Sequence, residues 1–154
     1  MNCQSRNMLH CIICGTNLGF IQPIGADMSY IITYNSEIQI LEIKFQGKVT
    51  KNDLKKAYEE AFPIAVREEC FLFLNDFIEA IISLRVFDVV EWAKTILKIG
   101  EDYGQNARLL KRAIILPVSY KDSKFAETVA SNRGYRIKLF KDVDNAKKWL
   151  LDEK

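Results

Sequence analysis

The chain has 154 residues, of which 49% are hydrophobic and 27% are charged. This length suits one domain, and the composition excludes collagen-like, disordered and disulfide-scaffold proteins. The 22 Lys and Arg residues against 20 Asp and Glu residues give a net charge of +2. Such a balance argues against nucleic acid as a partner. No segment reaches the ~18 consecutive apolar residues of a transmembrane helix, so stable membrane insertion is not expected.

Histidine is the residue whose scarcity restricts the chemistry most. The single histidine, His10, lies in an N-terminal stretch that we expect to be outside the folded domain. A domain without histidine cannot form a Ser-His-Asp triad, a Cys-His dyad or a histidine zinc site. The chain also has no P-loop and no dinucleotide-binding glycine motif. We therefore expect a non-enzymatic protein without a cofactor or a metal, although lysine or carboxylate catalysis stays open.

The four cysteines are concentrated at the N-terminus, and only Cys70 lies in the body of the chain. Cys11 and Cys14 form a C-x-x-C pair beside His10, a spacing found in zinc and redox sites. A zinc site requires further ligands that the sequence does not supply, and a redox pair would follow a strand. Cys70 is expected to be a small buried hydrophobe. Disulfides are not expected, which favours a reducing cytoplasm.

The first 27 residues lack the periodicity of the rest, so we expect a disordered or mis-assigned N-terminal extension followed by a domain over residues 28–154. One interpretation is an early start codon, with Met28 as the working initiator. A second is a secretory signal, with Arg6, an apolar stretch over 8–20 and cleavage after Ala26. A third is a small arm that binds a metal or a partner.

From residue 28 onward, periodicity and turn signals predict the order β-β-α-β-α-β-α-β-α. The predicted elements are strands over 30–34, 38–45, 71–74, 113–116 and 135–140, and helices over 50–62, 86–99, 122–133 and 142–151. Strands separated by helices favour right-handed crossovers and a mostly parallel sheet. The opening hairpin adds an antiparallel strand. The predicted fold class is therefore a single α/β domain with a mixed, mostly parallel sheet and helices packed against it.

Several local signals set the expected boundaries. Thr50 and Asp53 have the spacing of a capping box at the start of a helix. Pro63 is expected to kink or end that helix, because proline has no N–H to donate. Gly47 is expected to end one strand and Asn75-Asp76 to end the next. The pairs Lys111-Arg112 and Lys147-Lys148 are expected to be solvated charges rather than anion sites.

Longer phrases of the sequence carry a family resemblance. These are FQGKVT with Asp53-Leu54, FLFLND over 71–76, KRAII over 111–115, FAETVASNRG over 125–134, and FKDVDNA over 140–146 with Trp149-Leu150. Over about residues 29–151 the chain resembles STAS domains (sulfate transporter and anti-sigma factor antagonist), especially the SpoIIAA-like branch related to SEC14-like lipid-binding domains. The resemblance implies the STAS fold and a regulatory or protein-interaction module.

Anti-sigma antagonists of this family are switched by phosphorylation of a hydroxyl after the third strand, a position that corresponds to Ser83. The chain departs from the family here, because Leu84 and Arg85 follow Ser83 and the Asp-Ser-Ser-Gly motif is missing. The alternative is that Ser83 caps the following helix. A phosphate at this helix N-terminus would be electrostatically favourable.

The segment 77–84 is expected to be an unusually apolar loop. It could complete the core, bind a partner, or form the lid of an apolar ligand pocket. It follows the C-terminal end of a central strand, where open α/β sheets place their sites. The candidate interaction or ligand residues are Asn75, Asp76, Phe77, Ile81, Ser83 and Arg85.

The sequence thus favours a cytoplasmic regulatory or protein-interaction module of STAS type, switched by phosphorylation or a ligand at the loop after the third strand. The alternative is a carrier of a small apolar ligand or lipid that uses 77–84 as its lid. The expected partner is an unidentified protein or that apolar ligand, and a homodimer is a further option.

Overall fold

Six strands form one sheet in sequence order, β1-β2-β3-β4-β5-β6. The computed structural model describes residues 20–21, 30–82, 86–106, 109–117 and 135–152. The strands are β1 (Phe20–Ile21), β2 (Tyr30–Asn35), β3 (Ile40–Val49), β4 (Leu72–Ile82), β5 (Lys111–Ile115) and β6 (Arg136–Phe140). The described helices are α1 (Lys51–Arg67), α2 (Val86–Asp102) and α4 (Val143–Leu151).

The strand directions confirm the predicted mixed, mostly parallel sheet. Strands β1 and β2 are antiparallel to their neighbours, and β3 to β6 run parallel. Helix α1 connects β3 to β4, and α2 lies between β4 and β5 in the chain. The predicted helix over 122–133 lies outside the described residues.

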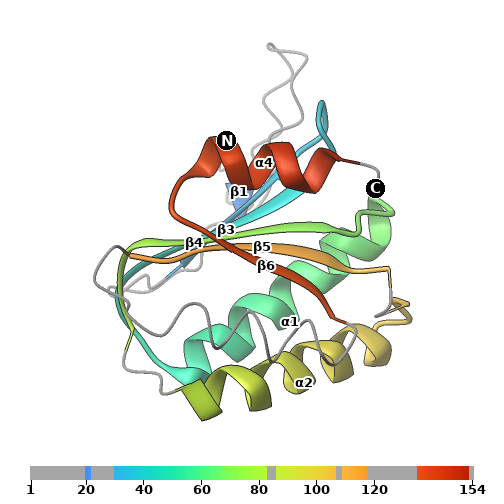
Figure 1. Cartoon of the computed structure of the whole chain (residues 1–154). Helices are drawn as coiled ribbons and strands as arrows, with labels where there is room; N and C mark the ends of the chain where they lie inside the picture. Colours follow the sequence, from blue (N-terminus) through green and yellow to red (C-terminus); the bar gives the residue numbers. More distant parts are fainter. Residues whose placement is uncertain (1–19, 22–29, 83–85, 107–108, 118–134, 153–154) are drawn as a thin grey trace, which may run out of the picture.

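The helices form two unequal layers on the sheet: α1 and α2 lie on one side and α4 on the other (Figure 1). The larger core lies between the sheet and the α1/α2 layer and contains Phe45, Phe62 and Phe73. A smaller core lies under α4 and contains Leu74 and Leu150. Because side chains alternate along a strand, neighbouring residues of β3, β4 and β5 belong to different cores.

Local capping chemistry determines where two helices begin. The Asp53 N–H donates to Thr50 Oγ1 over 3.2 Å, and the Thr50 N–H donates to Asp53 Oδ2 over 2.8 Å, which confirms the predicted capping box. Asp142 caps α4 by accepting from the Asn145 N–H over 2.8 Å. Both caps satisfy N–H groups that have no partner within the helix.

Two secondary-structure elements continue past residues at which they were expected to end. Helix α1 continues through Pro63 to Arg67, and Pro63 is exposed on its outer side. Strand β3 continues through Gly47 to Val49, because glycine adopts φ +63° there without a side-chain penalty. The prediction that Gly47 ends this strand is therefore wrong, as is the prediction that Pro63 could end the helix.

The largest difference from expectation is the length of β4. The strand was expected over 71–74 with a loop over 77–84, but β4 continues to Ile82. Its pairing with β3 continues through Gly47–Ala80 and Val49–Ile82. Asn75 does not end the strand, because its side chain is buried and hydrogen-bonded within the fold. The loop prediction is therefore wrong for residues 77–82.

The predicted N-terminal extension contributes two described residues to the sheet. In β1, Phe20 pairs with Thr33 and Ile21 with Ile32. The other residues of 1–27, including the C-x-x-C pair and His10, lie outside the described residues. Within the described part of the chain, no helix has the length and apolar character needed to cross a membrane.

Candidate functional site

The C-terminal half of β4, residues 77–82, divides between the core and the surface; we call it the β4 extension. Phe77 and Ala80 are both 7% exposed and belong to the larger core. Ile78 is 47% exposed and Ile81 is 66% exposed. The β4 extension therefore anchors itself by one set of side chains and presents another set to solvent.

A bulge in β4 sets which side chains face outward. Lys44 of β3 pairs with Asp76, but Gln46 pairs with Glu79, so β4 carries one additional residue between these pairs. Asp76 Oδ1 accepts a hydrogen bond from the Ile78 N–H over 2.9 Å within this bulge. An aspartate that bonds to an N–H two residues later stabilises such a local turn.

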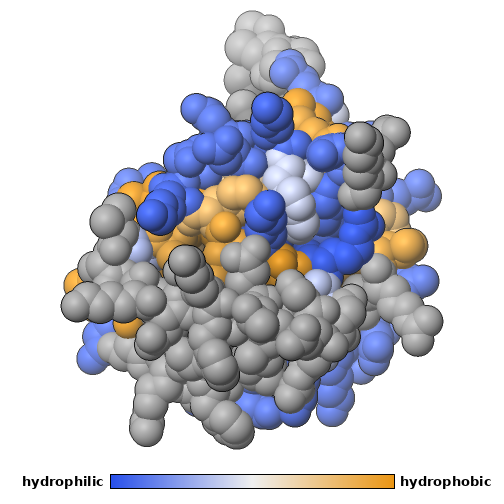
Figure 2. Space-filling view, in the orientation of Figure 1, coloured by the Kyte–Doolittle hydropathy of each residue, from blue (hydrophilic) through white to orange (hydrophobic). Residues whose placement is uncertain are grey.

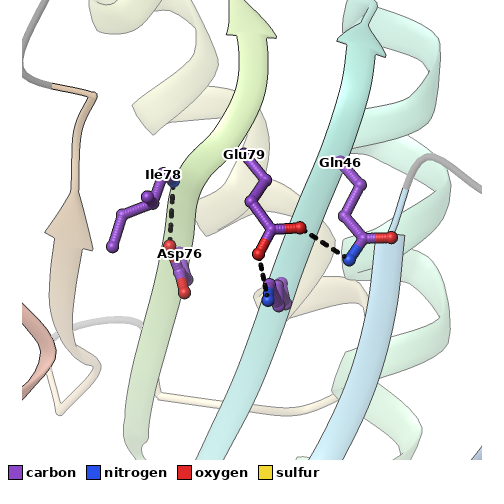
Figure 3. A network of polar contacts seen from close by, with 5 residues as sticks. Gln46, Asp76, Ile78 and Glu79 are labelled. Carbon is purple, nitrogen blue, oxygen red and sulfur yellow. Dashed lines mark hydrogen bonds and ion pairs between the residues drawn. The ribbon is translucent and has the colours of Figure 1, made fainter.

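Glu79 is the centre of a polar network that links β3 to β4. Its Oε1 lies 2.7 Å from Lys44 Nζ, and its Oε2 accepts from Gln46 Nε2 over 3.0 Å (Figure 3). The hydrogen bond from Lys44 lowers the pKa of Glu79, and the same bond raises the pKa of Lys44. Both side chains are exposed, so solvent screening keeps the contribution of this pair to stability small.

These groups lie on the side of the sheet that α4 covers in part. An ion pair of 2.7 Å between Glu42 of β3 and Lys147 of α4 marks the edge of the covered part. Beyond it lies a surface that we call the open face, formed by Lys44, Gln46, Lys48, Asp76, Glu79 and Ile81. Figure 2 shows hydrophobic side chains reaching the surface over the sheet below α4, with hydrophilic side chains around them.

The predicted site residues of β4 lie on both sides of the sheet, because successive side chains of a strand point in opposite directions. Asp76 and Ile81 lie on the open face, whereas Asn75 and Phe77 are buried on the opposite side of the sheet. Ser83 and Arg85 lie outside the described residues, and phosphorylation of Ser83 stays a prediction. A lid over residues 77–82 is excluded, because they form a strand paired with β3.

A second polar group of residues lies inside the larger core. The Tyr58 hydroxyl donates to Asn75 Oδ1 over 2.6 Å, and Asn75 Nδ2 donates to the Ala113 carbonyl over 3.4 Å. The Arg112 guanidinium lies within hydrogen-bonding reach of the Tyr58 oxygen. We call Tyr58, Asn75 and Arg112 the buried polar cluster. Each of the three is at most 2% exposed.

Burial governs the electrostatics of this cluster. Burial raises the pKa of Tyr58, and the positive charge of Arg112 opposes this increase. Burial also lowers the pKa of Arg112. The expectation that Lys111 and Arg112 are solvated is wrong: they are 3% and 2% exposed. Their side chains point to opposite sides of β5, as successive residues of a strand do.

Lys111 has a structural role on the α4 side. Its ammonium group donates to the main-chain carbonyls of Trp149, Leu150 and Asp152 at the end of α4, the latter two over 3.1 and 2.6 Å. A cation at a helix C-terminus satisfies carbonyls that have no partner within the helix. Burial lowers the pKa of Lys111.

Sequence reasoning missed the buried polar cluster because its members are distant in the chain. A usable signal was the position of Arg112 in the apolar strand KRAII, where alternation directs it to the same side as Ile114. Among the described residues, no group of His, Cys, Asp and Glu side chains has the arrangement of a metal site.

No protein-family model matches the chain, and no curated protein matches it. Among solved structures, the chain is similar to an uncharacterised protein of the DUF3478 family with a SpoIIAA-like fold from Shewanella loihica PV-4. The two share 24% sequence identity, with 88% of this chain and 94% of that chain covered, at a TM-score of 0.44.

Proposed function

We propose that this chain is a non-enzymatic protein-interaction module that receives its partner on the open face. The observation that carries the proposal is the exposure of Ile81, which is 66% in a surface of polar side chains. Exposed apolar groups with a polar rim are typical of partner-binding surfaces. The charges of the open face balance, with Lys44 and Lys48 against Asp76 and Glu79. This balance favours recognition by apolar contact over recognition by charge.

The proposed partner is a protein that contributes an extended segment along β4. Strand β5 pairs with β4 only as far as Asp76, whereas β3 pairs with β4 to Ile82. Among the described residues, the β4 extension therefore has a strand neighbour on one side only. Unpaired N–H and C=O groups at a strand edge pair readily with an added strand, and neighbouring side chains then provide specificity.

Site-specific photo-cross-linking in the full chain tests this proposal. A photoreactive residue at position 81 is expected to cross-link one protein in cells of the source organism. The matched control is the same residue at Val66, an exposed position of α1 that is not part of the open face. Equal products at both positions, or a second copy of this chain as the product at 81, would contradict the proposal.

The captured protein is then purified, and its binding to the wild-type chain is measured by calorimetry. Ile81→Glu is expected to weaken binding by about tenfold or more, which corresponds to about 1.4 kcal/mol. Val66→Glu is expected to leave the affinity unchanged. If Ile81→Glu binds as tightly as the wild type, the open face is not the interface.

A further inference from the structure

The buried polar cluster contains a cation without a counter-charge among the described residues. Arg112 is 2% exposed and is one of the largest fully buried side chains. None of the ion pairs among the described residues involves it. Its Nε is buried and has no hydrogen-bond partner within the described part of the chain.

This arrangement is energetically costly unless a negative group completes it. Taking a guanidinium out of water costs several kcal/mol, and an unpaired N–H adds a further penalty. Many buried cations avoid this cost by losing their proton, but arginine keeps its proton in proteins. Among the described residues, no group supplies the negative charge that would offset this cost.

The surroundings of Arg112 indicate which anion would fit. The hydroxyl of Tyr58 already donates to Asn75, whereas the Nε–H of Arg112 has no acceptor among the described residues. The Tyr58 ring is stacked near Phe73, with ring centroids 6.0 Å apart, and meets Trp92 edge-on at 5.7 Å. A single buried cation among aromatic rings can balance an anion with one negative charge. An anion with two negative charges would keep one of them without a counter-charge in this apolar environment.

We propose that Arg112, supported by Tyr58 and Asn75, forms a binding site for a monocarboxylate. The planar guanidinium presents Nε and a terminal nitrogen in the fork that matches the two oxygens of a carboxylate. Tyr58 and Asn75 are positioning residues, because the Tyr58 oxygen lies beside the guanidinium and is itself held by the hydrogen bonds from Tyr58 to Asn75 and from Asn75 to the Ala113 carbonyl. This site is on the opposite side of the sheet from the open face and does not depend on the function proposed above.

Nitrogen-15 NMR of the Arg112 Nε–H group tests the proposal on the wild-type chain. The probe is formate, because the smallest carboxylate is the one least excluded by its size. The control is formamide, which has a similar shape and no charge. The cross-peak is assigned as the one that Arg112→Lys removes. Formate is expected to move this cross-peak saturably, and formamide is expected to leave it in place.

Three results would overturn the proposal. The cross-peak does not move with formate, as when a carboxylate of the chain itself already pairs with Arg112. It moves linearly with formate, as the Nε–H of exposed Arg67 would. It moves saturably with sulfate and not with formate, which would exclude a monocarboxylate. If the Arg112→Lys variant is poorly folded, the cross-peak is assigned instead by triple-resonance experiments on the wild-type chain, so the titrations remain decisive.

Thermal unfolding provides a second readout. A ligand that binds the folded state raises the melting temperature by mass action. Formate is expected to stabilise the wild type relative to formamide at equal concentration. Tyr58→Phe removes the oxygen beside Arg112 while retaining the ring, and is expected to weaken the apparent formate affinity several-fold. An unchanged affinity in Tyr58→Phe would exclude the positioning role of Tyr58.

Discussion

The rings of Phe45 and Phe77 lie parallel within 1°, with centroids 4.4 Å apart. They come from neighbouring strands, β3 and β4, and both belong to the larger core. Phe77 was expected in a loop that could open as a lid. The stacking instead attaches the beginning of the β4 extension to the core, so the outward-facing residues that follow are presented on a rigid element.

Stability measurements distinguish the two kinds of residue in the β4 extension. Phe77→Ala is expected to lower the free energy of unfolding by about 3–5 kcal/mol, because it leaves a cavity next to Phe45. Ile81→Ala is expected to change it by less than about 0.5 kcal/mol, since Ile81 is mostly exposed. Urea titration followed by circular dichroism measures both. Similar losses in the two variants would contradict the division of this segment into core and surface.

Lys111 is expected to stabilise α4. Lys111→Met retains the apolar stem but leaves the carbonyls of Leu150 and Asp152 without their charged donor. We expect a loss of about 1–3 kcal/mol in the free energy of unfolding, with faster amide exchange in α4 than in α1. Lys148→Met is the matched control, because Lys148 is an exposed residue of the same helix. If the two variants are equally stable, the contacts of Lys111 contribute nothing.

Acid is expected to weaken the N-terminus of α4. The N–H of Asn145 holds the pKa of Asp142 below its usual value of 3.8. The stabilisation by this carboxylate is therefore present above the unfolded-state pKa and is lost as the pH falls through the lower, folded-state pKa.

Asp142→Asn isolates this effect, because asparagine also caps helices but does not titrate. The stability advantage of the wild type over Asp142→Asn is expected to shrink as the pH falls from neutral to about 2.5. Melting temperatures of both proteins across this range measure the change. If the stability advantage of the wild type over Asp142→Asn is constant over the whole pH range, the ionised Asp142 carboxylate does not stabilise α4 in the way described.

Cys70 is expected to be chemically inert in the folded protein. It is 2% exposed, and burial raises the pKa of its thiol, which lowers the thiolate fraction that reacts. Iodoacetamide treatment followed by peptide mass spectrometry is expected to leave Cys70 unmodified in buffer and to modify it fully in denaturant. Peptides with the other cysteines are read separately. Rapid modification of Cys70 in buffer would contradict its position in the core.

The fold was largely predictable because its signals are local. Thr50 and Asp53 lie three residues apart, and their capping box is visible in the sequence and present in the structure. Asp142 likewise begins α4 at the predicted place. The apolar periodicity of 86–99 predicted a helix that the structure describes over Val86–Asp102. Such features depend on neighbours in the chain, so sequence patterns report them well.

The candidate site was less predictable because its causes are non-local. Asn75 is typical of a strand end, but Tyr58 and Ala113 satisfy its side chain and allow β4 to continue. The basic pair Lys111-Arg112 has the composition of a solvated surface. The pair is buried because β5 is an interior strand with β4 and β6 on either side. Only the tertiary arrangement reveals these partners.

Amide hydrogen exchange on the complex with the cross-linked partner tests the central claim most directly. Exchange is compared between the free chain and the chain at saturating concentrations of that purified protein. The account predicts slower exchange in residues 77–82, because an added strand pairs with the free edge of β4, and unchanged exchange at the end of α1 around Val66. Unchanged exchange in 77–82 together with slower exchange elsewhere would contradict the addition of a partner strand along β4.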